Sequence, residues 1–218
     1  MKSTEASVTE DPTTSFLLAE HTRLSELYLE TRETADRRVT LYLTLTTTIV
    51  GALVALFQFK LAAADFTETA LAAAVGSVLL GALTFHRVIE RSMQGTEYLR
   101  AINRLHRYFV ERAPEIEPYL YWRACDDVPH YDLRGVGGAE TREIVMLIDS
   151  VFAGAAVGLA ILLVSQQQVI AALVLGLVAA GAAAYAHRRY EQFAMAREER
   201  RKASQVRFPE KADSEARA

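Results

Sequence analysis

The chain has 218 residues, of which 51% are hydrophobic and 23% are charged, and its formal net charge is −3. Four long stretches hold almost none of these charges. A helix of a soluble protein carries polar residues on one face, so this uneven pattern excludes an ordinary soluble helical core. The single cysteine, Cys125, excludes an intramolecular disulfide and a metal cluster of cysteine ligands.

The four stretches have the length of membrane spans. Residues 1–13 are polar and are predicted to be a disordered tail. A helix rises about 1.5 Å per residue, so about 20 residues cross the hydrocarbon layer of a bilayer. The sequence therefore predicts an all-α fold, a four-helix transmembrane bundle made of two hairpins, which occupy residues 14–112 and 144–190. The predicted spans are residues 39–59, 69–85, 144–164 and 169–186.

The basic residues predict how these spans are oriented. Of the 24 lysines and arginines, all but Lys60 lie in residues 1–38, 87–143 and 187–218. Lysine and arginine are enriched on the cytoplasmic side of membrane proteins. We therefore expect a multi-pass protein of the cell's inner (plasma) membrane with both termini in the cytoplasm.

The first and second spans are predicted to continue as cytoplasmic helices. Apolar residues recur there at spacings of three and four, before the first span and after the second. Pro114 and Pro118 should end the second extension near residue 112. We expect a cytoplasmic loop over residues 113–143 and a basic, partly disordered tail over residues 191–218.

Small residues in the spans predict close helix packing. Gly154 and Gly158 form a G-x-x-x-G pair, which is typical of membrane helices whose backbones approach each other. The pattern does not distinguish packing within the bundle from packing between subunits. The residues expected at packing positions are Gly154, Gly158, Gly176, Ala180, Gly76 and Gly81.

A polar site inside the membrane is a further hypothesis. Asp149 is the only acid in a predicted span, and His86 and His187 should lie at a similar depth. An acid and an imidazole could carry protons or hold a gate, whereas an acid near a helix start is also stabilised by the helix dipole. The threonines of the first span could line a wet face or simply bond the carbonyl one turn back. They are Thr40, Thr44 and Thr48.

The ends of the second and fourth spans share a short pattern. His86-Arg87 is followed by Glu90, and His187-Arg188 is followed by Glu191. The pattern indicates either a duplicated hairpin or the usual enrichment of basic residues at inner helix ends.

Acidic residues crowd the predicted cytoplasmic loop, together with Cys125 and His130. Their spacing matches no closed zinc or calcium pattern, so we expect neither a metal nor another cofactor. Acids beside a proline are more typical of turns and of partners for nearby arginines. The residues weighed for metal binding or catalysis are Cys125, Asp126, Asp127, His130 and Asp132.

Two resemblances to known proteins concern the first predicted hairpin and the start of the loop that follows it. The run from Glu97 to Arg104, with Arg107-Tyr108-Phe109-Val110 and Pro118-Tyr119-Leu120-Tyr121, resembles uncharacterised bacterial integral membrane proteins. A hairpin flanked by cytoplasmic helices, over residues 15–112, is loosely similar to SLATT-type membrane effectors of bacterial defence systems. This second resemblance implies pore formation, although those proteins usually have two spans.

Three classes of function follow from these features. The favoured one is a membrane-embedded scaffold or interaction module, as a homo-oligomer or with a cytoplasmic protein partner. The alternative is a pore-forming effector or small ion or solute transporter that uses Asp149 and the threonine face. A membrane enzyme is the least favoured. The expected partner besides proteins is the lipid bilayer, and no nucleic acid is expected, because the basic tail fits anionic headgroups better.

Overall fold

The computed structural model describes residues 11–59, 63–120, 124–131, 139–165 and 168–210. Within these ranges the chain is all-α, without strands, as predicted. Two short 3₁₀ helices, η1 (Pro114–Tyr119) and η2 (Ala203–Gln205), follow the second and the last long helix. The long helices are α1 (Pro12–Gln58), α2 (Ala63–Arg112), α3 (Ala139–Ser165) and α4 (Val169–Lys202). Residues 1–10 of the predicted disordered tail lie outside the described ranges.

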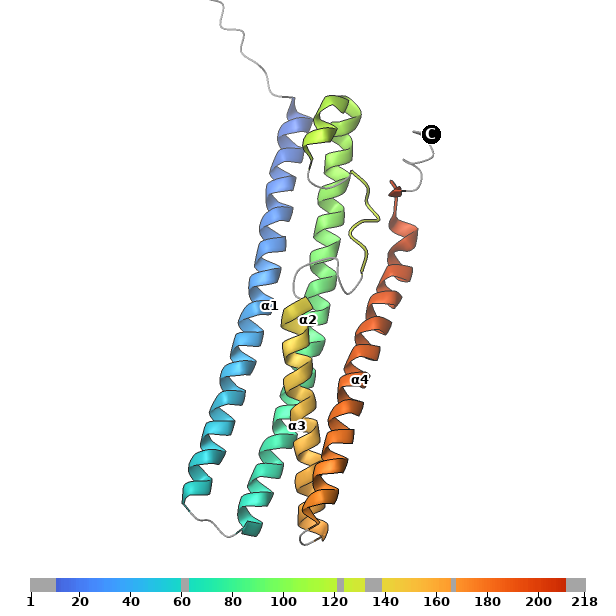
Figure 1. The fold of residues 1–218 in the computed structure, drawn as a ribbon. Coiled ribbons are helices and arrows are strands. Elements are labelled where there is room, and N and C mark those ends of the chain that lie inside the picture. The colour runs from blue at the N-terminus through green and yellow to red at the C-terminus, as the bar shows by residue number, and fades with distance from the viewer. Residues whose placement is uncertain (1–10, 60–62, 121–123, 132–138, 166–167, 211–218) are drawn as a thin grey trace, which may run out of the picture.

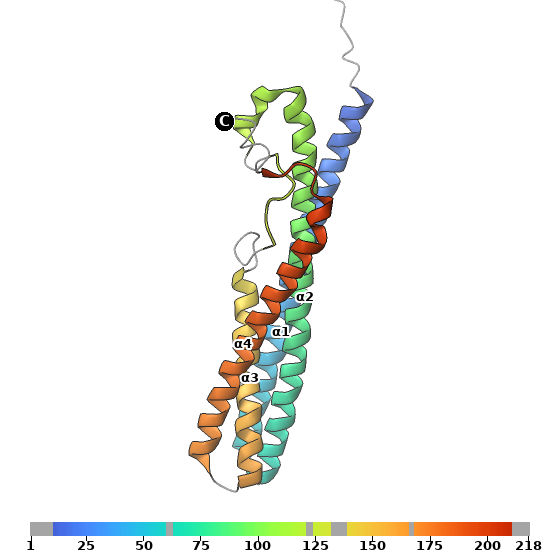
Figure 2. The ribbon, with the colours of Figure 1, turned by 90° about the vertical axis from the view of Figure 1, so that its right-hand side faces the viewer.

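The four helices pack in chain order. α1 lies against α2, α2 against α3 and α3 against α4, with each helix antiparallel to the next (Figure 1). α4 also contacts α2, beside which its second half runs (Figure 2), but in the described chain it does not touch α1. The bundle therefore consists of two hairpins that are joined mainly through α2 and α3.

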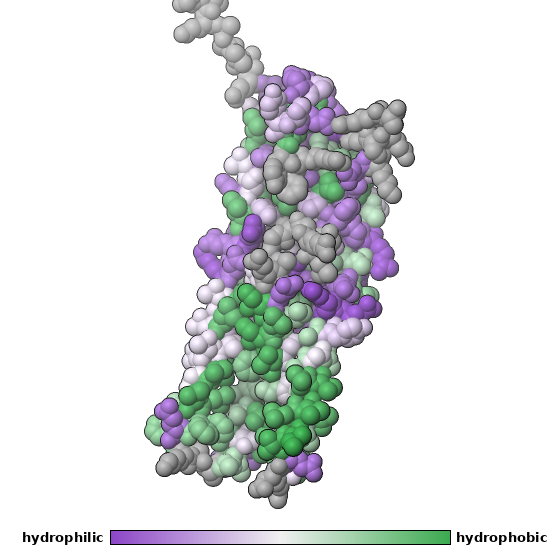
Figure 3. Space-filling model, in the orientation of Figure 1, coloured by the Kyte–Doolittle hydropathy of each residue, from purple (hydrophilic) through white to green (hydrophobic). Residues whose placement is uncertain are grey.

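The molecule divides along its length into an apolar and a polar half. Residues 12–38, 88–120, 124–131, 139–143 and 188–210 form what we call the polar half, and the rest of the four helices forms the apolar half. Hydrophobic side chains cover the lower part of the surface in Figure 3, and hydrophilic ones cover the upper part. All four helices are long and apolar enough to cross a membrane. Only 11–28% of each apolar window is buried inside the bundle, so most of its side chains point outward, as lipid contact requires.

Local sequence explains where α1 starts and α2 ends. The Asp11 carboxylate accepts a hydrogen bond from the backbone N–H of Thr13 at 3.2 Å, and Pro12 occupies the first helical position. α2 ends at Arg112, because Pro114 lacks the N–H that a continuing helix needs.

The fourth helix differs from the prediction. α4 continues to Lys202, whereas the sequence placed a basic, partly disordered tail from residue 191. Residues 203–210 are also ordered against the rest of the polar half. The extension is held against α2 by two ion pairs, Lys202 with Glu97 at 2.9 Å and Glu199 with Arg100 at 2.9 Å. Tertiary contacts therefore stabilise a segment whose composition alone favours disorder.

The hydrophobic core lies where the two halves meet. Its buried members come from three helices and join the first hairpin to the second. Leu43, Met93 and Ala194 pack against them, so α4 also contributes. The buried members are Val39, Tyr42, Phe85, Val88, Ile89 and Val145.

Glycines bring α3 and α4 into close contact in the apolar half. A Cβ atom on Gly154 would lie 2.6 Å from the Gly176 carbonyl oxygen and 2.9 Å from the Cβ of Ala180. A Cβ on Gly158 would lie 3.1 Å from the carbonyl oxygen of Ala172. The small residues of the second hairpin thus pack within one chain.

Gly76 does not take the packing position that the sequence suggested. In the described structure, no atom of another helix lies within 4 Å of the place where its Cβ would be. The face of α2 that carries Gly76 at this level points away from the neighbouring helices, and the sequence pattern cannot reveal that rotation.

The glycine contact predicts a specific loss of stability. Gly154→Ala should lower the free energy of unfolding by about 1–3 kcal/mol, because its methyl group would overlap the α4 backbone. Gly76→Ala is the matched control and should leave stability unchanged or raise it by up to about 1 kcal/mol, because alanine favours helix. Thermal unfolding of both variants in detergent micelles measures this. Equal melting temperatures for Gly154→Ala and the wild type would contradict the close contact.

Candidate functional site

The buried pair Asp149 and His187 is the candidate site in the apolar half. Asp149 comes from α3 and His187 from α4, and Oδ2 of the acid lies 3.0 Å from Nε2 of the imidazole. The side chains are 1% and 14% exposed. An ionised carboxylate is costly to bury without a partner, so the two groups depend on each other.

The second ring nitrogen fixes how the pair holds its protons. Nδ1 of His187 lies 2.8 Å from the carbonyl oxygen of Ala183. A carbonyl only accepts hydrogen bonds, so Nδ1 carries a hydrogen and donates it. One more proton is then shared between Nε2 and Oδ2. The pair is neutral overall whether it is written as imidazolium and carboxylate or as imidazole and carboxylic acid.

Aromatic and glycine residues enclose this pair. The Phe85 ring meets the His187 ring edge to face, with centroids 4.7 Å apart. Gly81 leaves the space that the Asp149 carboxylate fills, because a Cβ there would collide with it and lie 2.8 Å from the Tyr42 hydroxyl. The Tyr42 hydroxyl is buried without a hydrogen-bond partner in the described structure. Asp149 Oδ1 is likewise buried without one, so two polar atoms remain unpaired beside the shared proton.

A second buried ion pair lies at the boundary between the halves. Nε of Arg142 is 2.7 Å from Oε1 of Glu191, and both side chains are 3% exposed. Arg142 also donates to the hydroxyl of Ser92 at 2.9 Å, which ties α3 to α2. Arg188 lies 3.9 Å from Glu191 and adds a weaker attraction. The sequence analysis missed this pair, although Glu191 belongs to the repeated His-Arg-x-x-Glu pattern.

His86 does not join Asp149. Its side chain is 47% exposed, with Nδ1 2.5 Å from the Tyr190 hydroxyl and Nε2 3.3 Å from Glu90. Phe85 points into the bundle, and the next residue of a helix is turned by roughly 100°, which directs His86 outward. The repeated pattern therefore places its two histidines in different surroundings.

The threonine face of the first span does not line a site with Asp149 either. Thr40, Thr44 and Thr48 are exposed on the outside of the bundle. Each hydroxyl donates to the carbonyl four residues earlier, at 2.9, 2.8 and 2.8 Å. The threonine hydroxyls thus donate within α1. Of the two interpretations given for them, a wet face or a bond to the carbonyl one turn back, the structure shows the second.

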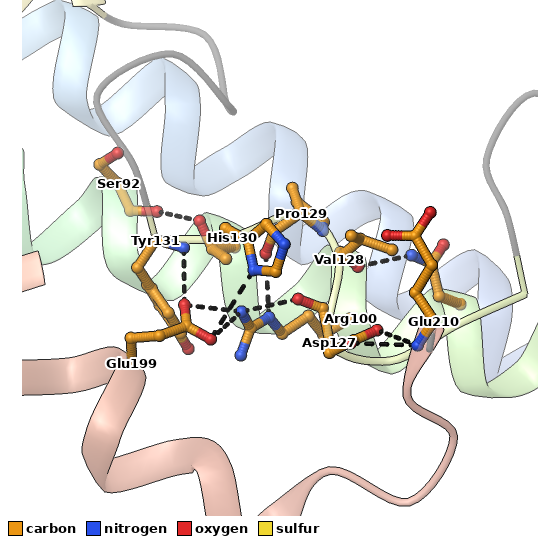
Figure 4. A network of polar contacts seen from close by, with 11 residues as sticks. Ser92, Arg100, Asp127, Val128, Pro129, His130, Tyr131, Glu199 and Glu210 are labelled. Carbon is orange, nitrogen blue, oxygen red and sulfur yellow. Dashed lines mark hydrogen bonds and ion pairs between the residues drawn. The ribbon is translucent and has the colours of Figure 1, made fainter. Parts of the chain in front are cut away.

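In the polar half, Arg100 organises a network of loop, α2 and α4 (Figure 4). Its side chain is 5% exposed and donates to the carbonyl oxygens of Pro129 and Asp127, both at 3.0 Å, and to Glu199 at 2.9 Å. Glu199 in turn accepts the backbone N–H of Tyr131 at 2.9 Å. Arg100 therefore fixes the loop to both helices.

Asp126 is another buried charge of the polar half. It is 0% exposed, accepts from Nε of Arg104 at 2.7 Å and accepts from the backbone N–H groups of Arg207 and Phe208. Burial by itself raises the pKa of Asp126, but these N–H groups and the arginine outweigh it and hold the pKa below its ordinary value. Asp126 therefore stays ionised at neutral pH as the acceptor for the segment that follows η2.

The loop residues weighed for metal binding are used differently. Cys125 is buried, and His130 lies 3.9 Å from Glu199. Asp132 lies outside the described residues. Within the described chain, no three histidine, cysteine or acidic residues are grouped as metal ligands would be. Asp126 and Asp127 both accept backbone hydrogen bonds.

The boundary ion pair predicts a non-additive pair of substitutions. Arg142→Met should lower the free energy of unfolding by about 3–5 kcal/mol, because it leaves Glu191 buried with only the weaker attraction of Arg188 at 3.9 Å. The double variant Arg142→Met with Glu191→Leu should recover most of that loss, because no charge is then buried. Unfolding of the single and double variants in detergent gives the coupling free energy. Additive losses would show that the two side chains do not depend on each other.

Comparisons with known proteins do not assign this arrangement to a family. No protein-family model, curated protein or solved structure matches the chain. The resemblance to SLATT-type effectors therefore stays an expectation, and function has to be argued from the geometry of the chain's own residues.

Proposed function

We propose that the chain is an integral membrane scaffold whose polar half is a cytoplasmic docking surface for a protein partner. The apolar half then spans the cytoplasmic membrane, and the basic residues put both chain ends on the cytoplasmic side. In α1 the 27 residues Pro12–Arg38 extend about 40 Å beyond the spans, far enough to be reached by another protein.

The observation that carries this proposal is a polar half that is joined by ion pairs between its elements and carries exposed apolar side chains on α1. Leu18 and Leu29 of α1 are 54% and 61% exposed. They are eleven residues apart, close to three helical turns, so they share one face of α1. Large apolar side chains that recur along one water-facing side of a helix are a feature that a protein partner can cover. The Arg100 network keeps the helices behind this face in one arrangement, which lowers the entropic cost of binding.

Photocrosslinking tests the docking surface. With p-benzoylphenylalanine in place of Leu18 or Leu29, irradiation of native cells should give a discrete protein adduct, because a partner covers this face. Leu79 is the matched control, since it is 62% exposed in the apolar half and should contact lipid. The adduct at Leu29 should disappear when Leu18→Glu is added. Adducts that are absent at both positions, or identical at Leu79, would contradict the proposal.

A pore or proton carrier is the second candidate, and one observation favours it. The shared proton of Asp149 and His187 lies beside two unpaired polar atoms, Asp149 Oδ1 and the Tyr42 hydroxyl. Buried ionisable groups of this kind occur in proton pathways. The threonine face of α1 does not support this candidate, because it is exposed on the outside of the bundle, whereas Asp149 and His187 are buried.

Proton flux separates the two candidates. Liposomes that hold the purified protein and an internal pH dye should acidify faster than empty vesicles if the pair carries protons. Asp149→Asn should then abolish the difference, because the amide cannot take up the proton. A wild-type rate equal to that of empty vesicles would remove the carrier function and leave the scaffold.

A further inference from the structure

Residues 206–210 lie as an irregular segment along the loop 124–131 and α2. They follow η2, which ends at Gln205, and they belong to no helix except at Glu210. Arg104 donates to the Gln205 carbonyl at 3.1 Å, where the segment leaves η2. The site that receives the segment, called the groove below, is thus made of α2 and of the loop that Arg100 holds in place.

The groove binds the segment mainly through its backbone. The Asp126 carboxylate accepts the N–H of Arg207 at 3.0 Å and that of Phe208 at 2.8 Å. The Asp126 N–H donates to the Phe208 carbonyl at 3.1 Å, and Asp127 accepts the N–H of Glu210 at 3.0 Å. The residue between these contacts is Pro209, which has no N–H to place. From Arg207 to Glu210, every backbone N–H that the segment has is therefore accepted by Asp126 or Asp127.

One side chain adds to this backbone binding. The guanidinium carbon of Arg107 lies 5.6 Å from the centroid of the Phe208 ring, within range of a cation–π contact. An aromatic residue followed by proline fits the groove in two ways, since the ring meets Arg107 and the proline restricts the backbone dihedral φ.

The segment can leave without unfolding a long helix. Asp126 is 0% exposed, whereas no residue of 206–210 is classed as buried. α4 is fixed to α2 by its own contacts, Glu199 with Arg100 and Lys202 with Glu97. Few apolar contacts and mostly backbone hydrogen bonds are typical of locally low stability. If the segment leaves, Asp126 keeps Arg104 and can bond to water or to another N–H.

We propose that this groove is a peptide-binding site for an aromatic-proline segment of a partner protein, occupied in cis by residues 206–210 of the chain itself. The partner segment presents backbone N–H groups to Asp126 and Asp127 and an aromatic ring to Arg107. A tethered ligand has an effective concentration of about millimolar, so it competes strongly with a free one. The chain's own segment is therefore an autoinhibitory ligand that has to leave first.

Peptide binding to the purified full chain tests the site. The probe is a fluorescent peptide with the sequence of residues 204–210, and fluorescence anisotropy measures its Kd in detergent micelles. Phe208→Ala weakens the cis segment, so this variant should bind the probe at least 10-fold more tightly than the wild type. Phe16→Ala is the matched control, because Phe16 is 68% exposed on α1 and the variant should bind as the wild type does.

A modified peptide tests the backbone recognition without changing the protein. Methylation of the nitrogen that corresponds to Phe208 removes the N–H that Asp126 accepts, so its affinity for the Phe208→Ala variant should fall at least 10-fold. Equal binding of both peptides, or no saturable binding to the variant, would overturn the proposal. A wild-type dimer that the peptide dissociates would assign the groove to a second copy of the chain and overturn the partner assignment. None of these results depends on the face of α1 that carries Leu18 and Leu29. The peptide experiments can therefore contradict the groove without contradicting the proposed scaffold function, and the crosslinking experiment can do the reverse.

Discussion

The close approach of α3 and α4 positions the polar side chains of the apolar half. In lipid the hydrophobic effect does not drive helices together, so contact depends on van der Waals packing between surfaces that fit. Gly154, Gly158 and Gly176 let the two backbones meet. Asp149 precedes Gly154 by five residues and His187 follows Ala180 by seven, so both side chains reach the same level on antiparallel helices. Wider spacing would leave the carboxylate of Asp149 buried without its imidazole.

The buried charges of the polar half also have partners, as Asp149 has His187 in the apolar half. Arg142 and Glu191 meet at the boundary, and Arg100 and Asp126 each have several partners above it. The closest partners of each buried charge lie in elements other than its own, so removal of one charged group leaves polar groups of another element without that partner. The helices, the loop 124–131 and the segment after η2 are therefore held in one arrangement by polar contacts, where the apolar half relies on glycine packing.

The sequence predicted the four helices because charge-free runs of span length are a strong and local signal. It could not predict which way each helix is rotated, and His86 and His187 show the consequence, since equal motifs place one histidine outside and the other against Asp149. The continuation of α4 was missed for a related reason. Its stabilising partners Glu97 and Arg100 lie about a hundred residues earlier in the chain, and a pattern of spacings holds no information on such pairs. The threonines of α1 needed only the carbonyls one turn back, which is a local contact.

Two of the buried acids, Asp149 and Asp126, differ in what can reach them. Asp149 is enclosed by Phe85, Gly81 and His187, all fixed in helices, so only a proton or a very small molecule can arrive without the helices moving apart. Asp126 is covered by residues 206–210, which are not themselves buried, and a peptide can replace one backbone N–H with another at almost no change in charge or desolvation. Exchange at Asp126 therefore costs the chain little beyond the contacts of the leaving segment. The polar half can then change its bound peptide while Arg100 and Glu199 keep α2 and α4 together, which is the property a docking protein needs.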